Sequence, residues 1–414
     1  MNKFLIERNF YLEKLISAMN HPVVKVITGI RRSGKSMLVF KLFYQHLLKS
    51  GISKDHIICV DLETQKNKPL RDSQKLYEFI TAKIVDDKRY YVLLDEIQLV
   101  DEFEDVAMGL MIDDHCDVYL TGSNAKLLSK DINTRFRGRS EEIRVYPLCF
   151  SEYISYLEKT ENAVDKSEAL KQFMLYGGLP YVCQLEDSKT RINYLNSINT
   201  TVLFRDLIER YEIRNEHLFS SVIEFLCSNI GSYVSAKKIS DTLKSNGFKT
   251  ASVEAIGNYL NHLCDSFLFY KVNRYDVKGK AFLKTLNKYY ISDLGLRNER
   301  LNFRQIELTH SLENLVYLEL IKRGYSVDIG KNNEKEIDFI VNESGGNLMY
   351  IQVAYTLMGE GKMEQELSSF KNLNDGYKKI VITMDNDPFT QLENGYKKLN
   401  VFDFLLNEKS LEEV

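Results

Sequence analysis

A strand, a glycine-rich loop and a helix follow one another without a break near the start of this chain. The β-branched run at residues 23–27 predicts a buried strand. The sequence GIRRSGKS follows at residues 29–36, and the apolar segment at residues 37–44 predicts a helix. The pattern G-x-x-x-x-G-K-S between a strand and a helix is typical of a phosphate-binding loop. A chance glycine turn with a surface lysine is the alternative, and the flanking strand and helix disfavour it.

Each position of this loop has its own physical task. Gly29 and Gly34 permit backbone torsions and close approaches that a Cβ would block. The N–H groups of the loop and of the helix start face the phosphates with partial positive charge. Lys35 adds a full charge for the β- and γ-phosphates, and the Ser36 hydroxyl is a ligand for Mg²⁺. ATP and Mg²⁺ are therefore the expected ligands, and the predicted nucleotide-binding residues are Gly29, Ile30, Arg31, Arg32, Ser33, Gly34, Lys35, Ser36 and Met37.

A predicted strand at residues 90–94 ends in two adjacent acidic residues, Asp95 and Glu96. At a strand end beside the phosphate loop, Asp95 is placed to hold Mg²⁺ through water, which makes it a predicted metal-binding residue together with Ser36. Glu96 is the predicted catalytic base, which accepts a proton from the attacking water. A helix N-cap followed by an acidic residue in the first turn is the alternative explanation of the pair.

The predicted strand at residues 117–121 also ends in polar residues. A side chain at this point can orient water against the γ-phosphate. Asn124 is the predicted catalytic residue here, with Ser123 as the second choice. A cap between a strand and a helix explains the same residues nearly as well.

The arginine-rich segment RFRGRS at residues 135–140 comes next, before a predicted fifth strand around residues 142–146. Arg139, and after it Arg137, is the predicted arginine that reaches the γ-phosphate bound by a neighbouring copy of the chain. Such a role requires a homo-oligomer, which we therefore expect. A basic turn on a solvated face is an equally good explanation.

This order of motifs resembles the AAA+ ATPases, and more specifically the prokaryotic AAA+ ATP-binding proteins that carry an uncharacterised C-terminal region. The resemblance implies an α/β fold with a P-loop NTPase parallel sheet at residues 1–149 and a helical lid at residues 150–215. In such a lid Arg205 is a candidate phosphate sensor, although an Arg beside an Asp on a helix is more often part of a surface ion pair. The segments that carry the resemblance are GIRRSGKS (29–36), LLDEIQ (93–98), LTGSNAKLLS (120–129), RFRGRS (135–140), YPLCFSEY (146–153) and YGGLPYV (176–182).

Residues 216–300 predict a winged-helix domain. Three helical segments, a turn at Gly247 and two strands follow one another in the order helix, helix, turn, helix and β-hairpin. The helices are expected at residues 218–230, 235–243 and 253–263, and the strands at residues 267–270 and 286–291.

The charge of this domain differs from that of the rest of the chain. Between residues 237 and 288 there are ten Lys and Arg residues and four Asp and Glu residues. Such a basic segment can neutralise DNA phosphates, which makes DNA a candidate partner. A winged helix that contacts proteins, with solvated lysines on its hairpin, is the alternative. The basic residues expected on the wing are Lys271, Arg274, Lys278, Lys280, Lys284 and Lys288.

The last region, residues 301–414, has the layout of restriction-endonuclease-like nucleases. In that resemblance Glu313 on a helix and Asp338 on a strand match Mg²⁺ ligands, and the next strand carries E-x-K. Here that strand has Gln352-Val353-Ala354 instead. Because Mg²⁺ favours carboxylate oxygen, the region is predicted to keep a degenerate PD-(D/E)xK-like α/β shape and to lack hydrolysis.

The composition is that of a large protein with extensive cores. The chain has 414 residues, 44% of them hydrophobic, and a net charge of −3, which does not mark the whole chain as a nucleic-acid binder. Its six cysteines are far apart and form no C-x-x-C pair, which is typical of a reduced, cytoplasmic protein. No apolar run reaches the ~18 residues of a membrane span, so we expect no membrane partner.

Two functions are consistent with these features. The first is a P-loop ATPase that binds and hydrolyses ATP with Mg²⁺ to drive conformational change or assembly, with DNA as a candidate partner. The alternative is a nucleotide-gated switch that binds protein or DNA with little turnover. An ATP-regulated nuclease is disfavoured by Gln352 and Ala354.

Overall fold

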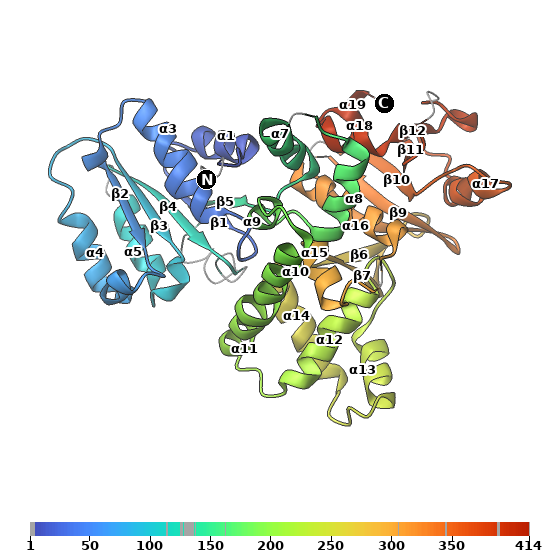
Figure 1. Cartoon of the computed structure of the whole chain (residues 1–414), viewed down its shortest axis with the longest axis horizontal. Coiled ribbons are helices and arrows are strands. Elements are labelled where there is room, and N and C mark those ends of the chain that lie inside the picture. The colour runs from blue at the N-terminus through green and yellow to red at the C-terminus, as the bar shows by residue number, and fades with distance from the viewer. Residues whose placement is uncertain are drawn as a thin grey trace. The chain divides into compact units, whose positions relative to one another are not determined.

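The chain divides into two compact units (Figure 1), which are described separately below. The first comprises Met1–Pro147 with Asp265–Phe267, and the second comprises Leu148–Cys264 with Leu268–Val414. The computed structural model describes residues 5–112, 115–124, 127, 136, 138–161, 163–304, 306–343, 346–386 and 390–413.

The first unit is built on a five-stranded sheet in the order β2-β3-β4-β1-β5. Every neighbouring pair of strands is parallel, which confirms the parallel sheet predicted from the sequence. The strands are β1 (Val24–Thr28), β2 (Ile57–Asp61), β3 (Tyr90–Asp95), β4 (Cys116–Gly122) and β5 (Ser140–Arg144).

Helices cover both faces of this sheet (Figure 1), because the strand side chains alternate between two apolar layers. One layer joins strand residues such as Tyr91 to α1 (Asn9–Ser17) and to the helix after the phosphate loop. The other joins residues such as Val92 to α4 (Ser73–Thr81) and α5 (Phe103–Ile112). The helix after the loop consists of α2 (Lys35–Met37), the π-helical η1 (Leu38–Phe43) and α3 (Tyr44–Lys49), and short 3₁₀ segments occur at η2 (Lys54–His56), η3 (Gln65–Arg71) and η4 (Ile97–Leu99).

The second unit begins with a helical region. Its helices are α7 (Phe150–Thr160), α8 (Lys166–Tyr176), α9 (Pro180–Cys183), α10 (Ser188–Ser197), η6 (Ile198–Phe204), α11 (Arg205–Arg210), α12 (Glu216–Ser228), α13 (Ala236–Ser245), α14 (Val253–Asp265) and α15 (Leu294–Arg300). The three helices predicted for a winged helix correspond to α12, α13 and α14. A hairpin of β6 (Phe269–Asp276) and β7 (Ala281–Ile291) follows them.

This hairpin belongs to the same sheet as the strands of the C-terminal region. The sheet has seven strands in the order β12-β11-β10-β9-β8-β6-β7, and β6 pairs in parallel with β8 (Ser326–Asn332). The sequence analysis separated a winged helix from a C-terminal domain at residue 300, but no gap in the sheet corresponds to that boundary. The remaining elements are α16 (Leu308–Lys322), β9 (Lys335–Asn342), β10 (Leu348–Ala354), α17 (Lys362–Leu367), η7 (Ser368–Phe370), β11 (Lys378–Thr383), η8 (Glu393–Gly395), β12 (Lys397–Asn400), α18 (Val401–Leu406) and α19 (Ser410–Glu413).

Helix α15 anchors the Tyr-Gly-Gly-Leu-Pro turn within the second unit. Asp293 caps this helix by accepting a hydrogen bond from the Leu296 backbone N–H (3.1 Å), and its other carboxylate oxygen accepts one from the Gly178 N–H (2.7 Å). Burial raises the pKa of Asp293 to about 6, although these backbone N–H groups favour its charged form. A Cβ at Gly177 would lie 2.0 Å from the Asp293 carboxylate, so the turn requires glycine there.

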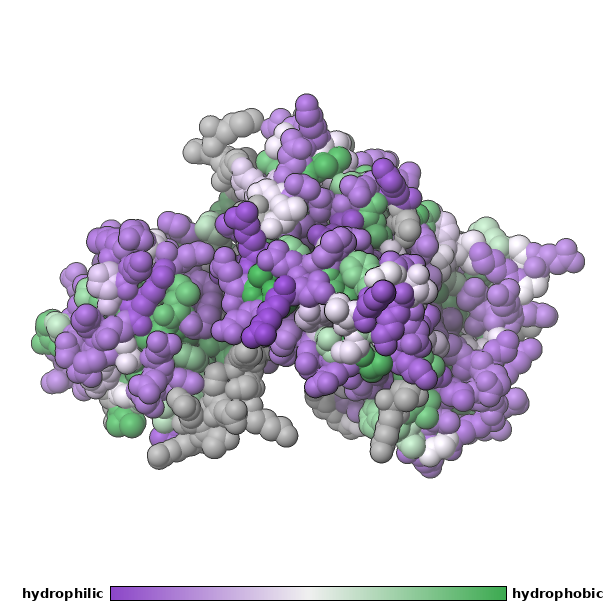
Figure 2. All heavy atoms as spheres, turned by 90° about the horizontal axis from the view of Figure 1, so that it is seen from below, coloured by the Kyte–Doolittle hydropathy of each residue, from purple (hydrophilic) through white to green (hydrophobic). Residues whose placement is uncertain are grey.

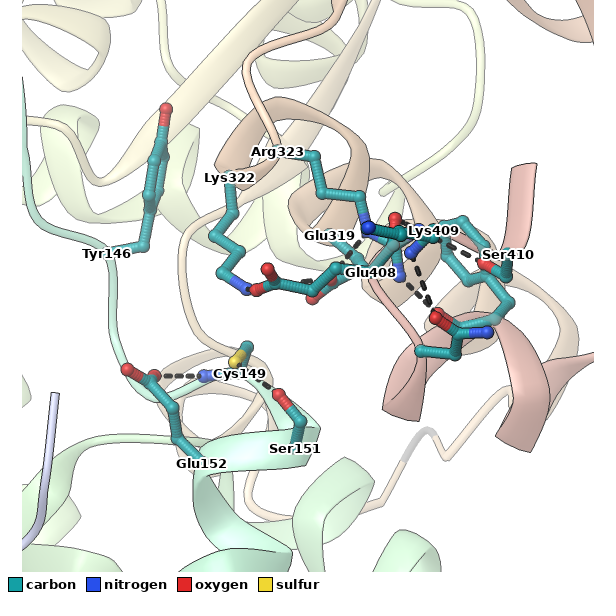
Figure 3. A network of polar contacts seen from close by, with 12 residues as sticks. Tyr146, Cys149, Ser151, Glu152, Glu319, Lys322, Arg323, Glu408, Lys409 and Ser410 are labelled. Atoms are coloured by element: carbon teal, nitrogen blue, oxygen red, sulfur yellow. Dashed lines mark hydrogen bonds and ion pairs between the residues drawn. The ribbon is translucent and has the colours of Figure 1, made fainter. Parts of the chain in front are cut away.

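A second buried polar cluster lies around the end of α16 (Figure 3). Glu319 accepts a hydrogen bond from Nε of Arg323 (2.8 Å), and Nζ of Lys322 lies 2.5 Å from a carboxylate oxygen of Glu408. Arg323 also donates to the Glu408 carbonyl oxygen (3.0 Å). Cys149, which precedes α7, lies near this cluster, and burial raises the pKa of its thiol well above the ordinary value. The cluster therefore connects α16 with the C-terminal helices.

The surface in Figure 2 is largely hydrophilic, with apolar side chains in small separate areas. Among the helices whose residues are described, none is both long and apolar enough to cross a membrane.

The core of the first unit contains a fully buried ion pair between β1 and β4. Nζ of Lys25 lies 2.5 Å from Oδ1 of Asp117 and also donates to the carbonyl oxygen of His21 (2.8 Å). Oδ2 of Asp117 accepts from the Asn20 N–H (2.9 Å) and from the Tyr119 hydroxyl (3.1 Å). Burial lowers the pKa of Lys25, and the contact with Asp117 opposes that shift. Each charge therefore depends on the other for its stability.

We expect Lys25→Met to lower the free energy of unfolding of the first unit by about 3–5 kcal/mol, because it leaves the Asp117 carboxylate buried without its cation. Adding Asp117→Asn should restore most of this loss, because an amide keeps an acceptor oxygen and carries no charge. Urea unfolding of the single and double variants measures the two effects. Strictly additive losses would contradict the assignment of this pair.

Candidate functional site

The phosphate loop leaves the carboxyl end of β1 through two glycines that have positive φ angles. Gly29 has a φ of +147° and Gly34 a φ of +97°. A Cβ at Gly29 would lie 2.1 Å from the carbonyl oxygen of Val145, far inside contact distance. Both positions therefore require glycine, for backbone conformation at Gly34 and for close approach as well at Gly29.

Lys35 lies within the loop. Its side chain is only 4% exposed, and its ammonium donates to the carbonyl oxygens of Gly29 (2.9 Å) and Ile30 (3.1 Å). The charge is thus held where the loop backbone turns. Of the other predicted loop residues, Ile30 and Ser33 are buried, Arg31 lies 3.6 Å from Glu63, and Arg32, Ser36 and Met37 are exposed.

The two predicted metal-binding residues are brought together. Asp95 ends β3, and its carboxylate accepts a hydrogen bond from the Thr121 hydroxyl and lies near the hydroxyl of Ser36. Burial raises the pKa of Asp95, and these two hydroxyls partly oppose the shift. A hydroxyl beside a carboxylate at the front of the loop fits Mg²⁺, which is commonly held by one or two protein oxygens together with phosphates and water. Within the described ranges, no group of three or more His, Cys, Asp or Glu residues is arranged to hold a metal ion.

Glu96 follows Asp95 in a left-handed backbone conformation, with a φ of +52°. Its backbone N–H donates to the Thr121 hydroxyl (3.1 Å). Its carboxylate accepts from the Gln98 side-chain amide and from the Ser123 hydroxyl (3.3 Å). Glu96 is therefore held at the sheet edge by neighbouring polar groups.

The two polar residues predicted after β4 differ in their contacts. Ser123 is 2% exposed and contacts the Glu96 carboxylate. Asn124 is 5% exposed, and its carbonyl oxygen accepts from the N–H of Leu127 (3.2 Å). The contact with Glu96 is therefore made by the second-choice residue.

Arg139 is exposed and lies at the opposite end of the strands from the phosphate loop. Ser140 is the register partner of Val24, and the Arg139 carbonyl oxygen accepts from the Val24 N–H (2.9 Å). At ~3.3 Å per residue, the length of β1 separates this point from the loop by about 16 Å. Arg139 therefore cannot reach the phosphates bound by its own chain. Arg137 lies outside the described residues.

Arg205 is exposed in the first turn of α11. Its neighbour Asp206 is paired with Arg210 one turn later, with 2.8 Å between the charged atoms. The ion pair expected on this helix thus involves a different arginine.

Three residues of the site were missed by the sequence analysis. The Thr121 hydroxyl contacts both Asp95 and the Glu96 backbone, and Gln98 holds the Glu96 carboxylate. Arg8 donates to the backbone of the phosphate loop. Gln98 lies in the segment LLDEIQ, two residues after the candidate base, where a polar residue is a usable signal. Thr121 lies 25 residues from Glu96, and no local pattern indicates its contacts. Arg8 lies before the first strand, and nothing in its local sequence indicates the contact.

A separate charged cluster lies in the second unit, at the residues that resembled a nuclease site. Lys288 of β7 is 3% exposed, and its Nζ lies 2.8 Å from Glu313 and 2.5 Å from Glu336. Burial acts to lower the pKa of Lys288, but the surrounding carboxylates outweigh it and the pKa is raised. Burial, together with the charge of Glu313, raises the pKa of Asp338, whose carboxylate accepts from the Val353 N–H (2.8 Å).

This cluster corrects one expectation about the wing. Lys288 was counted among the basic residues available to DNA phosphates, but its ammonium is buried against carboxylates. The exposed side of α14 carries Glu254, Asn258 and Asn261, with no Lys or Arg. Exposed lysines lie on α13 and the turn after it, at Lys237, Lys238, Lys244 and Lys249, and on the hairpin, at Lys271, Lys278 and Lys280.

Three family models match successive parts of the chain. The family described as "AAA domain" matches residues 21–154. Two families described as domains of unknown function, DUF8612 and DUF4143, match residues 167–307 and 308–401. The Walker-type ATPase PABY2304 of Pyrococcus abyssi is similar in fold, with a TM-score of 0.52 and 16% identity over 72% of this chain and 96% of that one.

The fold and the loop define this protein as one with a P-loop AAA domain. An uncharacterized protein of Haemophilus influenzae is 36% identical over 98% of this chain and 100% of its own length. An uncharacterized protein of Methanocaldococcus jannaschii is 31% identical over 92% of this chain and 85% of its own length. The chain belongs to the same family as these two proteins.

Proposed function

We propose that this protein binds ATP with Mg²⁺ at residues 29–37 and hydrolyses it to drive a conformational change or an assembly step. The observation that carries this proposal is the meeting of the Ser36 hydroxyl with the Asp95 carboxylate, beside the buried Lys35 ammonium. When bound, Mg²⁺ neutralises charge on the β- and γ-phosphates. Ser36 and Asp95 are the residues that would hold it.

Four side chains are proposed to bind the phosphates and to activate the attacking water. Lys35 exchanges two carbonyl oxygens for phosphate oxygens as the nucleotide enters the loop. Glu96 accepts a proton from the attacking water, once its carboxylate leaves Gln98 and Ser123. Asn124 and Ser123 are the proposed residues that orient this water. If the Glu96 carboxylate keeps its hydrogen bonds with Gln98 and Ser123, the protein binds nucleotide with little turnover. This is the alternative function, a nucleotide-gated switch.

Two substitutions separate binding from hydrolysis. We expect Lys35→Ala to abolish measurable ATP affinity, because it removes the ammonium assigned to the β- and γ-phosphates. We expect Glu96→Gln to bind ATP normally and to release phosphate at least 100-fold more slowly, since general-base catalysis contributes about 10²–10⁴. Calorimetry and steady-state phosphate release measure the two effects.

Lys41→Ala is the matched control for Lys35→Ala, because Lys41 is exposed on the same helix. It should bind and hydrolyse ATP as the unmodified protein does. Binding without any phosphate release in the unmodified protein would favour the gated switch. Normal ATP turnover by Glu96→Gln would contradict the assignment of Glu96 as the catalytic base.

The position of Arg139 supports a homo-oligomer in which this arginine acts on the nucleotide of a neighbouring copy. Its exposed side chain lies at the end of the sheet opposite to its own phosphate loop. Phosphate release per subunit should therefore rise with protein concentration. Arg139→Ala should lose that rise and fall by about 10³-fold or more at high concentration.

Arg214→Ala is the control for Arg139→Ala, because Arg214 is also exposed but lies in the second unit. Turnover that is independent of concentration, and that is the same in both variants, would contradict an action between copies.

DNA is the proposed partner of the second unit, held through phosphate contacts and left uncut. Lys237 and Lys244 are exposed on α13, whereas α14 presents no basic residue on its exposed side. The proposed loss of cutting is supported by Glu313, whose carboxylate pairs with Lys288 and accepts from the Tyr290 hydroxyl (2.5 Å). Gln352 accepts from the Ser369 hydroxyl (3.1 Å) instead of offering a carboxylate to a metal.

We expect duplex DNA to bind with steep salt dependence, to remain intact in Mg²⁺, and to bind Lys237→Glu/Lys244→Glu weakly. The slope of log K against log salt should fall by about 2 in that variant, since each lost phosphate contact changes it by about 0.9. Fluorescence anisotropy measures binding, and electrophoresis of the same samples measures cutting. Lys166→Glu/Lys189→Glu changes two exposed lysines outside this region and should leave the slope unchanged. Equal slopes in the two variants would exclude α13 as the contact.

A further inference from the structure

Arg8 lies just before α1 and contacts two segments that are distant in sequence. Nη1 donates to the carbonyl oxygen of Ser33 (2.8 Å), and Nη2 donates to the carbonyl oxygen of Tyr146 (2.8 Å). The guanidinium carbon lies 4.6 Å from the centre of the Tyr11 ring. The residue is only 3% exposed, so these contacts are shielded from water.

The contact with Ser33 fixes a peptide group of the phosphate loop. The Ser33 carbonyl and the Gly34 N–H belong to one planar peptide unit, in which the two bonds point in opposite directions. Because Arg8 holds the Ser33 carbonyl, the Gly34 N–H is fixed in the direction away from the guanidinium group. Backbone N–H groups at the front of a helix are the groups that bind phosphate.

The contact with Tyr146 fixes the end of the first unit beside the same loop. The Tyr146 N–H donates to the Tyr11 hydroxyl (3.3 Å), and the Val145 N–H donates to the Thr28 carbonyl oxygen (2.7 Å). Residues 145–146 are thus bound to α1 and to the end of β1. Arg8 adds the direct link from this segment to the loop.

We propose that Arg8 is a positioning residue for phosphate binding. Its single guanidinium group holds the phosphate loop at a fixed position relative to residues 145–146. This inference rests on the proposed function, in which the loop binds a nucleotide. Arginine suits the task because its planar fork donates in two directions at once, whereas an ammonium has no such fixed geometry. Without it, two carbonyl oxygens in a nearly water-free position would lose a charged donor.

Three variants test the inference. Arg8→Met removes both donors, and Arg8→Lys keeps the charge without the fork. Arg191→Met is the matched control, because Arg191 also donates to a backbone carbonyl oxygen, that of Leu185 (2.8 Å), and lies over a tyrosine ring, but in the second unit. Each variant is compared with the unmodified full chain below its unfolding temperature.

Two measurements are made on each protein. Calorimetry with MgATP and MgADP should show affinities weaker by on the order of tenfold in Arg8→Met, by less in Arg8→Lys and not at all in Arg191→Met. Hydrogen exchange of the nucleotide-free proteins should be faster at residues 33–36 and 145–146 in both Arg8 variants only. A purely structural loss would lower stability in all variants without selecting these two segments.

The two measurements keep this inference separate from the proposed function. If the unmodified protein binds no nucleotide, the proposed function fails, and exchange in the nucleotide-free variants still decides whether Arg8 orders the loop. If the unmodified protein binds ATP but Arg8→Met binds it within twofold as tightly, Arg8 is not a positioning residue. Unchanged exchange at residues 33–36 in both Arg8 variants overturns the inference as well.

Discussion

The nucleotide site depends on how closely two backbone segments approach each other at Gly29. The carbonyl oxygen of Val145 occupies the space that a Cβ at this position would need, 2.1 Å away. This approach places the exit of β5 against the exit of β1, where the phosphate loop begins. Lys35 donates to the Gly29 carbonyl oxygen at this point, and Arg8 contacts the loop at Ser33 and the segment after β5 at Tyr146. A side chain at residue 29 would push these groups apart together.

The parts of the site that could be predicted from the sequence are those encoded within a few residues. Two glycines, a lysine and a serine between a strand and a helix specify the loop, and two acids at a strand end specify Asp95 and Glu96. Thr121 and Arg8 were not predictable in this way, because their roles arise from contacts with residues 25 or more positions away. For Arg139, the sequence supplies the candidate, and its place just before β5 excludes contact with the phosphate loop of its own chain.

In the second unit, local order was predictable and long-range pairing was not. Helices at α12, α13 and α14 and the following hairpin appear where their apolar spacing and turn residues indicate. The pairing of β6 with β8 joins that hairpin to strands about 55 residues later, for example Arg274 to Ile329. No local pattern shows this. The pairing makes the hairpin part of a larger sheet and brings Lys288 close to Glu313. The basic composition of the hairpin predicts a solvated lysine at this position, but Lys288 is buried in an ion pair with Glu313.

Burial, more than the number of charges, decides what a charged residue does in this protein. Lys25, Lys288 and Arg8 are each nearly inaccessible to water and are each matched by carboxylates or carbonyl oxygens of the same unit. For Glu313 this has a chemical consequence. A divalent cation would have to displace an ammonium that is part of the same chain and therefore present at a high effective concentration. The positive charge beside Glu313 is thus supplied by Lys288 of the hairpin.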